Sequence, residues 1–179
     1  ELVELRISGG DSAVVEEYNN HDLKYTPNGG SEDLKVEIAN LYGPNITKDH
    51  VLVFPGGQVA IQVAAQAFAK DVRSIVFCPG YQSTIESPGW AKGSKGITKL
   101  QRNYETKWQI DLDAVKKAIT PDTKYMVINE PHNPGGVIMS RETQIALVEL
   151  CAEHGIKIWS DEVYRLLEHD PERTRIPAM

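Results

Sequence analysis

The chain has 179 residues, of which 41% are hydrophobic and 25% are charged, as in an ordinary globular protein. Its formal net charge of −6 and the lack of a lysine- and arginine-rich block argue against a nucleic acid partner. Its apolar stretches are broken within about ten residues, so no membrane span is predicted. The two cysteines have no histidine partners nearby in the sequence, so no metal site is expected. The N-terminal ELVELRISGG lacks the features of a signal peptide, and a cytoplasmic location is expected.

Apolar runs that suit strands alternate with amphipathic segments that suit helices along most of the chain. Strands are predicted at 50–54, 74–78, 96–101, 125–128 and 156–160, and 1–8 is either a strand or an arm. Helices are predicted at 31–43, 56–70, 111–119 and 140–155. A weak helix after residue 80 is interrupted by Pro88 and Gly89. This alternation predicts an α/β fold with a doubly wound, mostly parallel sheet.

Glycine-containing and polar segments follow the ends of four predicted strands. They are Pro55 to Gln58, Pro79 to Tyr81, Asn129 to Gly136, and Ser160 to Tyr164. Ligands of such sheets bind outside the carboxyl ends of the strands, so we expect these segments to line one site. Gly56 and Gly57 either form a tight turn or let a phosphate approach the free N–H groups of the helix that follows.

Three side chains in these segments each allow two interpretations. Tyr81 could stack on a planar ligand or simply pack in its loop. Asp161 could pair with a cationic heterocycle nitrogen, or it could cap a helix or form a surface ion pair. Asn133 could bind a ligand or act as a turn former before Pro134. Taken one at a time, none of these residues decides a function.

In their order and spacing the motifs resemble those of fold-type I pyridoxal 5′-phosphate enzymes, most closely the class I/II aminotransferases. The matching segments are YTPNGG (25–30), GGQ (56–58), PGY (79–81), PHNPGG (131–136) and SDEVY (160–164). The most specific part is an Asn-Pro-x-Gly and an Asp-x-x-Tyr motif, whose Asn133 and Asp161 lie 28 residues apart. The resemblance covers nearly all of residues 1–168. It implies that the chain forms an incomplete large, cofactor-binding domain of this fold.

The resemblance implies how three side chains would treat the cofactor ring. Asp161 would bond the pyridine nitrogen and keep it protonated, so that the ring accepts electrons from the substrate. Tyr164 and Asn133 would hydrogen-bond the phenolic oxygen of the ring. Asn133 would also lie near the carboxylate of the substrate.

The other carried-over roles concern the ring face and the phosphate. Tyr81 would stack on the pyridine face, and the backbone N–H groups of Gly57 and Gln58 would bind the phosphate. Tyr25 would reach the phosphate of the neighbouring subunit, which makes a homodimer the expected assembly. Residues 1–30 would then be an N-terminal arm and dimer-contact segment, and 31–179 a partial pyridoxal-phosphate-binding large domain.

Several features depart from the pattern of this family. Gly135 replaces the Thr usual between Pro and Gly, a change expected to be mild in a turn, and Gly57 stands where a small side chain is more common. The Schiff-base lysine is not found after the Asp strand, so no catalytic residue is assigned and this lysine is expected beyond Met179. Lys95 lies upstream in a glycine-rich loop, which is a poor platform for a precise site.

The chain starts on Glu1 rather than Met, and we expect a fragment. His132, beside the Asn-Pro turn, is expected to pack rather than to act as a base. The predicted activity is transfer of an amino group between an amino acid and a 2-oxo acid, which are the expected substrates. A lyase, cyclase or oxidase of the same fold, and a non-catalytic fragment or partner subunit, are the alternatives. The pattern does not specify the substrate side chain.

Overall fold

The computed structural model of the chain describes residues 12–20 and 24–170. Its backbone contacts divide the chain into two compact units, each described by itself below. The first, the helical unit, comprises 1–41 and 46–53, and the second, the sheet unit, comprises 42–45 and 54–179. The predicted strand or arm at 1–8 lies outside the described residues. The expected change of role at residue 30, from arm to cofactor domain, stays a prediction.

The helical unit contains the helix predicted at 31–43 but not the strand predicted at 50–54. Its elements are α2 (Ser12–Asn19), α3 (Glu32–Asn40) and the 3₁₀ turn η1 (Lys48–His50). The strand prediction at 50–54 is wrong, because η1 occupies its start and the rest is irregular. The Val53 N–H donates to the Gly29 carbonyl at 2.9 Å, which is an isolated bond and not a ladder. An apolar run forms a strand only where a neighbouring strand provides a row of backbone hydrogen-bond partners.

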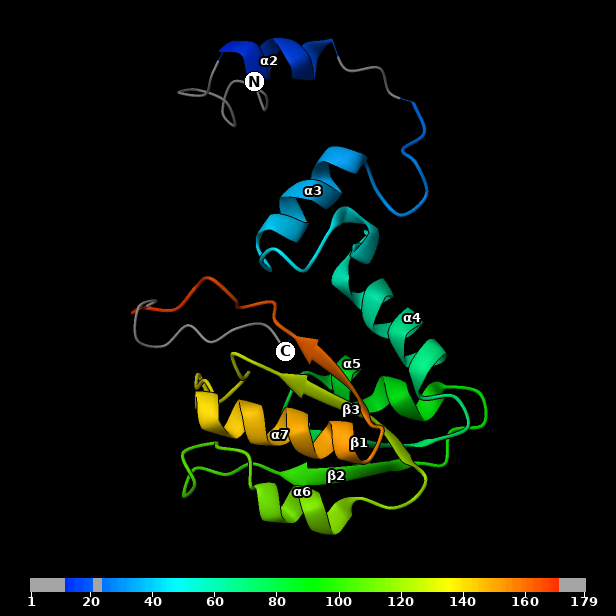
Figure 1. Ribbon diagram of the computed structural model, residues 1–179, viewed down its shortest axis with the longest axis vertical. Helices are drawn as coiled ribbons and strands as arrows, with labels where there is room; N and C mark the ends of the chain where they lie inside the picture. The colour runs from blue at the N-terminus through cyan, green and yellow to red at the C-terminus, as the bar shows by residue number, and fades with distance from the viewer. Residues whose placement is uncertain (1–11, 21–23, 171–179) are drawn as a thin grey trace. The chain divides into compact units, whose positions relative to one another are not determined.

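The sheet unit is built on four parallel strands (Figure 1). They are β1 (Arg73–Cys78), β2 (Ile97–Gln101), β3 (Thr123–Asn129) and β4 (Lys157–Asp161), in the spatial order β2-β1-β3-β4. The burial of β3 is nearly continuous, as expected for a strand covered on both faces. The predicted α/β fold with a parallel sheet is confirmed.

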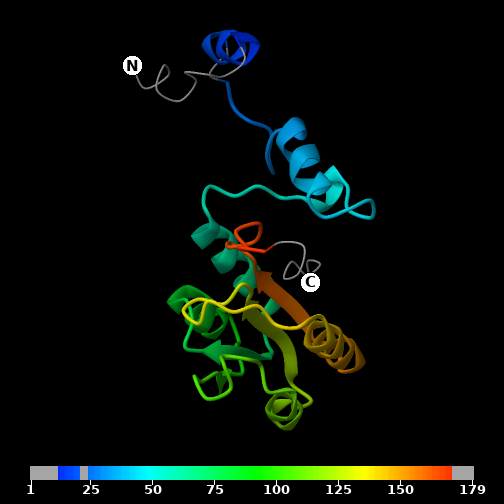
Figure 2. The same ribbon diagram turned by 90° about the vertical axis from the view of Figure 1, so that its left-hand side faces the viewer.

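Helices cover both faces of this sheet (Figure 2). Helices α6 (Leu112–Ala118) and α7 (Arg141–Glu153) lie on one face. The other face carries α4 (Gly57–Phe68), α5 (Gln82–Glu86) and the 3₁₀ turn η2 (Ser87–Trp90). The predicted interruption after residue 80 is real, because α5 ends where η2 begins with Ser87 and Pro88. Within the described residues, none of the helices has the length and apolar character needed to cross a membrane.

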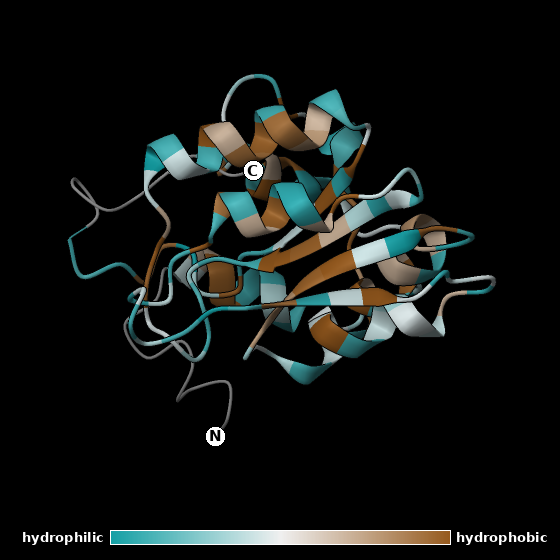
Figure 3. Cartoon of the chain, turned by 90° about the horizontal axis from the view of Figure 1, so that it is seen from below, coloured by the Kyte–Doolittle hydropathy of each residue, from teal (hydrophilic) through white to brown (hydrophobic). Residues whose placement is uncertain are grey.

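Two apolar layers hold the sheet between its helices (Figure 3). The larger layer packs β1 and β3 against α6 and α7, and its fully buried members include Ile75, Met126 and Leu147. The smaller layer, on the opposite face, includes Val76 and Tyr125. Successive residues of β1 thus serve opposite layers, as the two-residue period of a strand requires.

The strand order creates a switch point beside β1. The chain passes from β1 outward to β2, returns across β1 to β3, and continues to β4. Because crossovers between parallel strands are right-handed, this reversal of direction places α5 on one face and α6 and α7 on the other. The connections leaving β1 and β3 therefore diverge, which opens a crevice outside their carboxyl ends.

A buried ion pair fixes the loops beside this crevice. Arg102, which follows β2, and Glu130, which follows β3, are 2% and 5% exposed, and their Nη1 and Oε1 atoms are 2.7 Å apart. Glu130 Oε2 also accepts a bond from the backbone N–H of Met139 at 3.0 Å, and Arg102 Nε donates to the Trp108 carbonyl. Burial raises the pKa of Glu130, while Arg102 lowers it. The pair therefore depends on both partners being present.

We expect Arg102→Leu to destabilise the protein by about 3–5 kcal/mol, because it leaves the Glu130 carboxylate buried and unpaired. Denaturant unfolding measures the change. The control is Lys99→Leu, which breaks the exposed Lys99–Glu86 pair and should cost less than about 1 kcal/mol. Adding Glu130→Gln to Arg102→Leu should recover stability, because the amide still accepts the Met139 N–H without a charge. Equal costs for Arg102→Leu and Lys99→Leu would contradict this interpretation.

Candidate functional site

A cavity of about 460 Å³ opens at the carboxyl ends of the strands in the sheet unit. Six of the seven sequence-predicted site residues line it, namely Gly57, Gln58, Tyr81, Asn133, Asp161 and Tyr164. The fold brings them together from the start of α4, the loop after β1, the turn after β3 and the end of β4. The seventh, Tyr25, belongs to the helical unit, where its side chain is exposed.

The start of α4 forms an open, glycine-lined rim of this cavity. Gly56 has a φ of 101°, in the region that favours glycine, and Gly57 is the first helical residue. A Cβ atom added to either glycine would meet no heavy atom within 4 Å. The first N–H groups of a helix have no acceptor within it, and the helix dipole favours an anion there. This rim therefore has both the space and the donors for a phosphate.

Tyr81 and Gln58 are joined across the cavity wall. The Tyr81 hydroxyl donates to Gln58 Oε1 at 3.1 Å, linking the loop after β1 to the first turn of α4. The bond fixes the hydroxyl end of the phenol ring, while Tyr81 remains 44% exposed. A half-exposed aromatic face beside an anion-binding rim suits a planar ligand that carries a phosphate.

Asp161, at the end of β4, carries a half-buried carboxylate. Its Oδ1 accepts a bond from the Val163 backbone N–H at 3.2 Å. Burial raises the pKa of this carboxyl above its ordinary value, and the Val163 bond opposes the shift without cancelling it. None of the ion pairs between described residues includes Asp161. A cationic ligand atom would therefore lower the free energy of the ionised carboxylate.

Asn133 and Tyr164 face each other on another side of the cavity. The Asn133 Nδ2 donates to the Tyr164 hydroxyl oxygen at 3.4 Å, a long and weak bond that joins the turn after β3 to the segment after β4. Both groups retain hydrogens that could be donated to a ligand oxygen.

Two further residues line the same cavity: Trp159, which sequence reasoning missed, and Asn129, which began an expected lining segment but was given no role of its own. Trp159 precedes Asp161 by two positions in β4, so strand alternation places both side chains on one face. That periodicity could have identified Trp159. Asn129 is the register partner of Asp161 across β3 and β4, and this pairing is not visible without the sheet order.

His132 packs beside the Asn-Pro turn, as expected. It is 3% exposed, and its Nε2 lies 3.0 Å from the Pro79 carbonyl oxygen, to which the protonated nitrogen donates. Burial and the nearby Arg102 lower the pKa of its imidazole. His132 does not line this cavity but lines an adjoining pocket that shares Asn133 and Tyr164 with it, and its bond to the Pro79 carbonyl braces two loops.

The glycine at 135 proves to be a steric requirement and not a mild change. A Cβ atom at Gly135 would lie 2.6 Å from His132 Nδ1 and 2.7 Å from Trp108 Cγ. The Trp108 ring thus occupies the space that a Thr side chain would need. Lys107 and Trp108 both have positive φ angles, and the Trp108 carbonyl is held by Arg102.

Lys95 lies at the opposite edge of the sheet. Its Nζ pairs with Asp122 Oδ1 at 2.8 Å; Lys95 lies two residues before β2, and Asp122 directly precedes β3. They therefore sit at the amino ends of the strands, away from Asp161. Among the described residues that line the cavity, none is a lysine.

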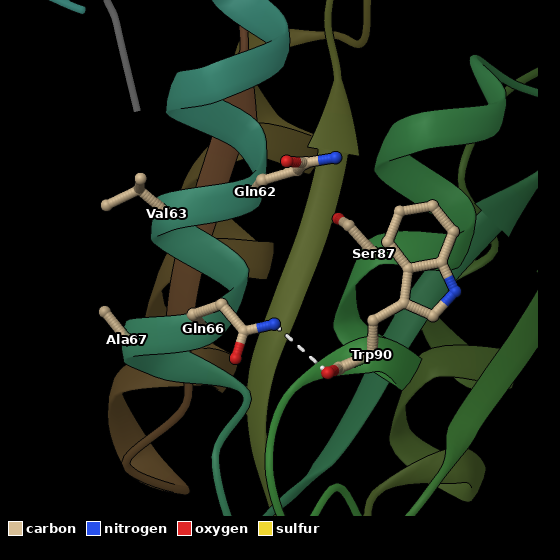
Figure 4. Close-up of a pocket in the computed structure, with 6 residues that line it drawn as sticks. All are labelled: Gln62, Val63, Gln66, Ala67, Ser87 and Trp90. Atoms are coloured by element: carbon tan, nitrogen blue, oxygen red, sulfur yellow. Dashed lines mark hydrogen bonds between the residues drawn. The ribbon is translucent and has the colours of Figure 1, made fainter.

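A second pocket lies along the side of α4 and is lined by none of the predicted residues (Figure 4). Its walls are formed mainly by α4 and η2, which are joined by a 3.1 Å bond from Gln66 Nε2 to the Trp90 carbonyl. It presents no charged side chain among its lining residues, Gln62, Val63, Gln66, Ala67, Ser87 and Trp90. The cavity at the strand ends is therefore the better candidate for chemistry.

Comparison with known proteins agrees with this geometry. The family model described as aminotransferase class I and II matches residues 12–177. The chain belongs to this family. Its members use pyridoxal 5′-phosphate.

Relatives of known name are about 30% identical to the chain over the residues that align. An aspartate aminotransferase of Geobacillus stearothermophilus is 32% identical over 164 residues, covering 88% of this chain and 41% of the relative. An arginine–pyruvate transaminase of Pseudomonas aeruginosa is 31% identical over 147 residues, covering 80% and 37%. A PLP-dependent aminotransferase of Streptococcus suis superposes with a TM-score of 0.81 at 28% identity, covering 92% and 44%. The chain thus spans about two fifths of the length of these family members.

The residues at the strand ends fit the cofactor of the aminotransferase family. The glycine rim leaves room and N–H donors for its phosphate, and Asp161 offers a carboxylate without a cationic partner to its ring nitrogen. Asn133 and Tyr164 offer donors to its phenolic oxygen. The match of donor to acceptor at three separate points makes this cavity the candidate site for that ligand.

The raised pKa of Asp161 predicts a pH-dependent effect of Asp161→Asn in the cofactor-free protein. An unfolded carboxyl titrates near its ordinary value of 3.8 and the folded one higher, so the folded state is penalised as the pH rises through that window. The amide carries no charge. The variant should therefore gain stability relative to the parent across the window and keep the gain at about pH 7.

Urea unfolding at several pH values measures this difference. Asp122→Asn is the control of opposite sign. Lys95 lowers the pKa of Asp122, so removing this carboxylate should cost stability at pH values above its ordinary pKa of 3.8. A stability difference for Asp161→Asn that does not vary with pH would contradict the assignment of a buried, unpaired charge.

We expect Gly135→Thr to destabilise the protein by about 1–3 kcal/mol or more, because its side chain overlaps Trp108 and His132. The cost should be smaller in a Trp108→Ala background, with a coupling above about 0.5 kcal/mol in a double-mutant cycle. Gly57→Ala is the control, since its Cβ meets open space. Independent, additive effects at 108 and 135 would show that the two side chains do not compete for one volume.

Proposed function

We propose that this chain forms part of an aminotransferase that uses pyridoxal 5′-phosphate to move an amino group between an amino acid and a 2-oxo acid. Membership of the class I and II family supports the reaction type. The observation that carries the proposal is the convergence of six motif residues on one cavity around the half-buried carboxylate of Asp161. Names of relatives range from aspartate to arginine–pyruvate transaminases, so the substrate side chain is left open.

In this proposal Asp161 controls a proton on the ring. Its carboxylate accepts a charge-assisted bond from the pyridine N–H, which favours the protonated nitrogen. The bound cofactor supplies an electron-accepting ring for the pair left on the substrate Cα when its proton is removed. The ring accepts the most electron density in the transition state, so this interaction would lower the activation barrier more than it tightens cofactor binding.

The other five of the six motif residues would orient the cofactor. Asn133 and Tyr164 donate to its phenolic oxygen, and Tyr81 covers one face of the ring. The N–H groups of Gly57 and Gln58 bind the phosphate at the start of α4. Contacts at three separate places on one planar ligand restrict both its tilt and its rotation, which is what a defined path for the Cα proton requires.

Other parts of the machinery are proposed to lie outside this cavity. The lysine that holds the cofactor covalently is proposed to follow Met179, since Lys95 is engaged at the other edge of the sheet. Tyr25, in a proposed N-terminal arm of residues 1–30, is proposed to contact the phosphate of a second copy. Its exposed side chain supports that role, and with it a homodimer. Residues 31–179 are the proposed share of the cofactor domain, and the cytoplasm is the proposed location.

The experiment uses the complete protein, with any sequence that flanks the 179 residues, and a panel of amino acids with a 2-oxo acid acceptor. We expect Asp161→Asn to retain the cofactor, seen by its visible absorbance, yet to slow loss of the Cα proton by several orders of magnitude. Lys95→Met, at the far edge of the sheet, is the control and should keep the parental rate. A near-parental single-turnover rate for Asp161→Asn would overturn the proposed role, and absence of amino transfer by the parent would overturn the proposed reaction.

A further inference from the structure

Asn129 joins the two sides of the cavity through both ends of its side-chain amide. Its Nδ2 donates to the backbone carbonyl of Asp161 at 2.9 Å. Its Oδ1 accepts from the backbone N–H of Asn133 at 2.8 Å. One short side chain thus connects the end of β4 with the turn after β3.

The bridge supplements an interaction that the sheet already makes. Asn129 and Asp161 are register partners, and the Glu130 N–H donates to the same Asp161 carbonyl at 3.1 Å. This carbonyl therefore receives two donors, one from the backbone and one from Asn129. The N–H of Asn133, in contrast, has left the ladder, and Asn129 supplies its acceptor.

Burial makes these bonds costly to lose. Asn129 is 8% exposed, so a removed partner is replaced by water only with difficulty. Both of its bonds go to backbone atoms, which fixes the main chain of Asn133 and Asp161 while their side chains stay available to a ligand. The two bonds use an acceptor and a donor separated by a single amide, and among side chains of this length only Asn offers both.

We propose that Asn129 is a positioning residue that sets the separation between Asn133 and Asp161, and hence the fit of a pyridine ring between them. The inference rests on the proposed function, in which Asp161 bonds the ring nitrogen and Asn133 the phenolic oxygen. These two atoms belong to one rigid ring, so their protein partners must be held at one distance. An error of about 1 Å in such a frame is enough to weaken both contacts.

The test uses the complete protein and pyridoxamine 5′-phosphate, an amine that binds without a covalent bond to lysine. Asn129→Leu removes both bridging bonds while keeping the branched skeleton of the side chain, and we expect about a 10-fold or greater loss of affinity. The pH at which the bound ring loses its nitrogen proton, followed by ultraviolet absorbance, should also fall. Inorganic phosphate, used as a competitor, should keep its inhibition constant within about twofold, because the rim at Gly57 is not bridged by Asn129.

Asn129→Asp supplies a second variant that keeps the acceptor for the Asn133 N–H, loses the donor to Asp161 and, when ionised, adds a negative charge beside that carbonyl. For Asn129→Asp we expect a change in the pH at which the bound ring loses its nitrogen proton. We expect a smaller loss of affinity than for Asn129→Leu. The matched control is Val127→Ala, which is buried on the same face of β3 and whose apolar side chain makes no hydrogen bond, although Val127 is the register partner of Trp159. It should reduce stability without changing the ring titration.

The outcomes separate this inference from the proposed function. If the parent binds pyridoxamine phosphate and both Asn129 variants keep parental affinity and titration, the positioning role is wrong. The role is also wrong if Val127→Ala shifts the ring titration as much as Asn129→Leu, because the effect would then be general to the strand. A parent that binds inorganic phosphate but not pyridoxamine phosphate would overturn the proposed function itself.

Discussion

Parallel pairing of β3 with β4 is the constraint on which the candidate site depends. In-register pairing of Asn129 with Asp161 ends both strands at one level, so the segments that follow begin side by side. In an antiparallel sheet the same two segments would leave from opposite edges, and the motif pair 28 residues apart would never meet. The α7 crossover, which is buried against the sheet, thus converts a separation in sequence into proximity at the cavity.

Much of this arrangement could be predicted from the order of elements, because apolar period and glycine or proline punctuation are local properties. Four of the strands and the helices between them follow from such signals. The strand prediction at 50–54 was wrong because a strand also needs a neighbouring strand to pair with, and a local sequence pattern does not show whether one is present. The two bridging bonds of Asn129 and the contact of Trp108 with Gly135 could not be predicted for the same reason, because they arise between segments that only the fold brings together.

The charged residues near the site fall into two groups: a buried ion pair that supports the fold, and a carboxylate that is left for a ligand. Glu130 and Arg102, buried behind the Asn133 turn, satisfy each other and serve the backbone. Asp161, on the cavity side, has no such partner among the described ion pairs and has a raised pKa. Unpaired charge at a binding site weakens the empty protein, and it is the kind of local cost that proteins accept where a ligand will offset it.

The tight packing of Trp108 against Gly135 couples the residues that the fold accepts at positions 108 and 135. With Trp108 in place, a side chain at 135 overlaps two rings, whereas a glycine there is compatible with either a large or a small residue at 108. From the present pair, a side chain at 135 is therefore accepted only after the indole at 108 has been replaced by a smaller group. The two positions are epistatic, because the effect of a substitution at one depends on the residue at the other.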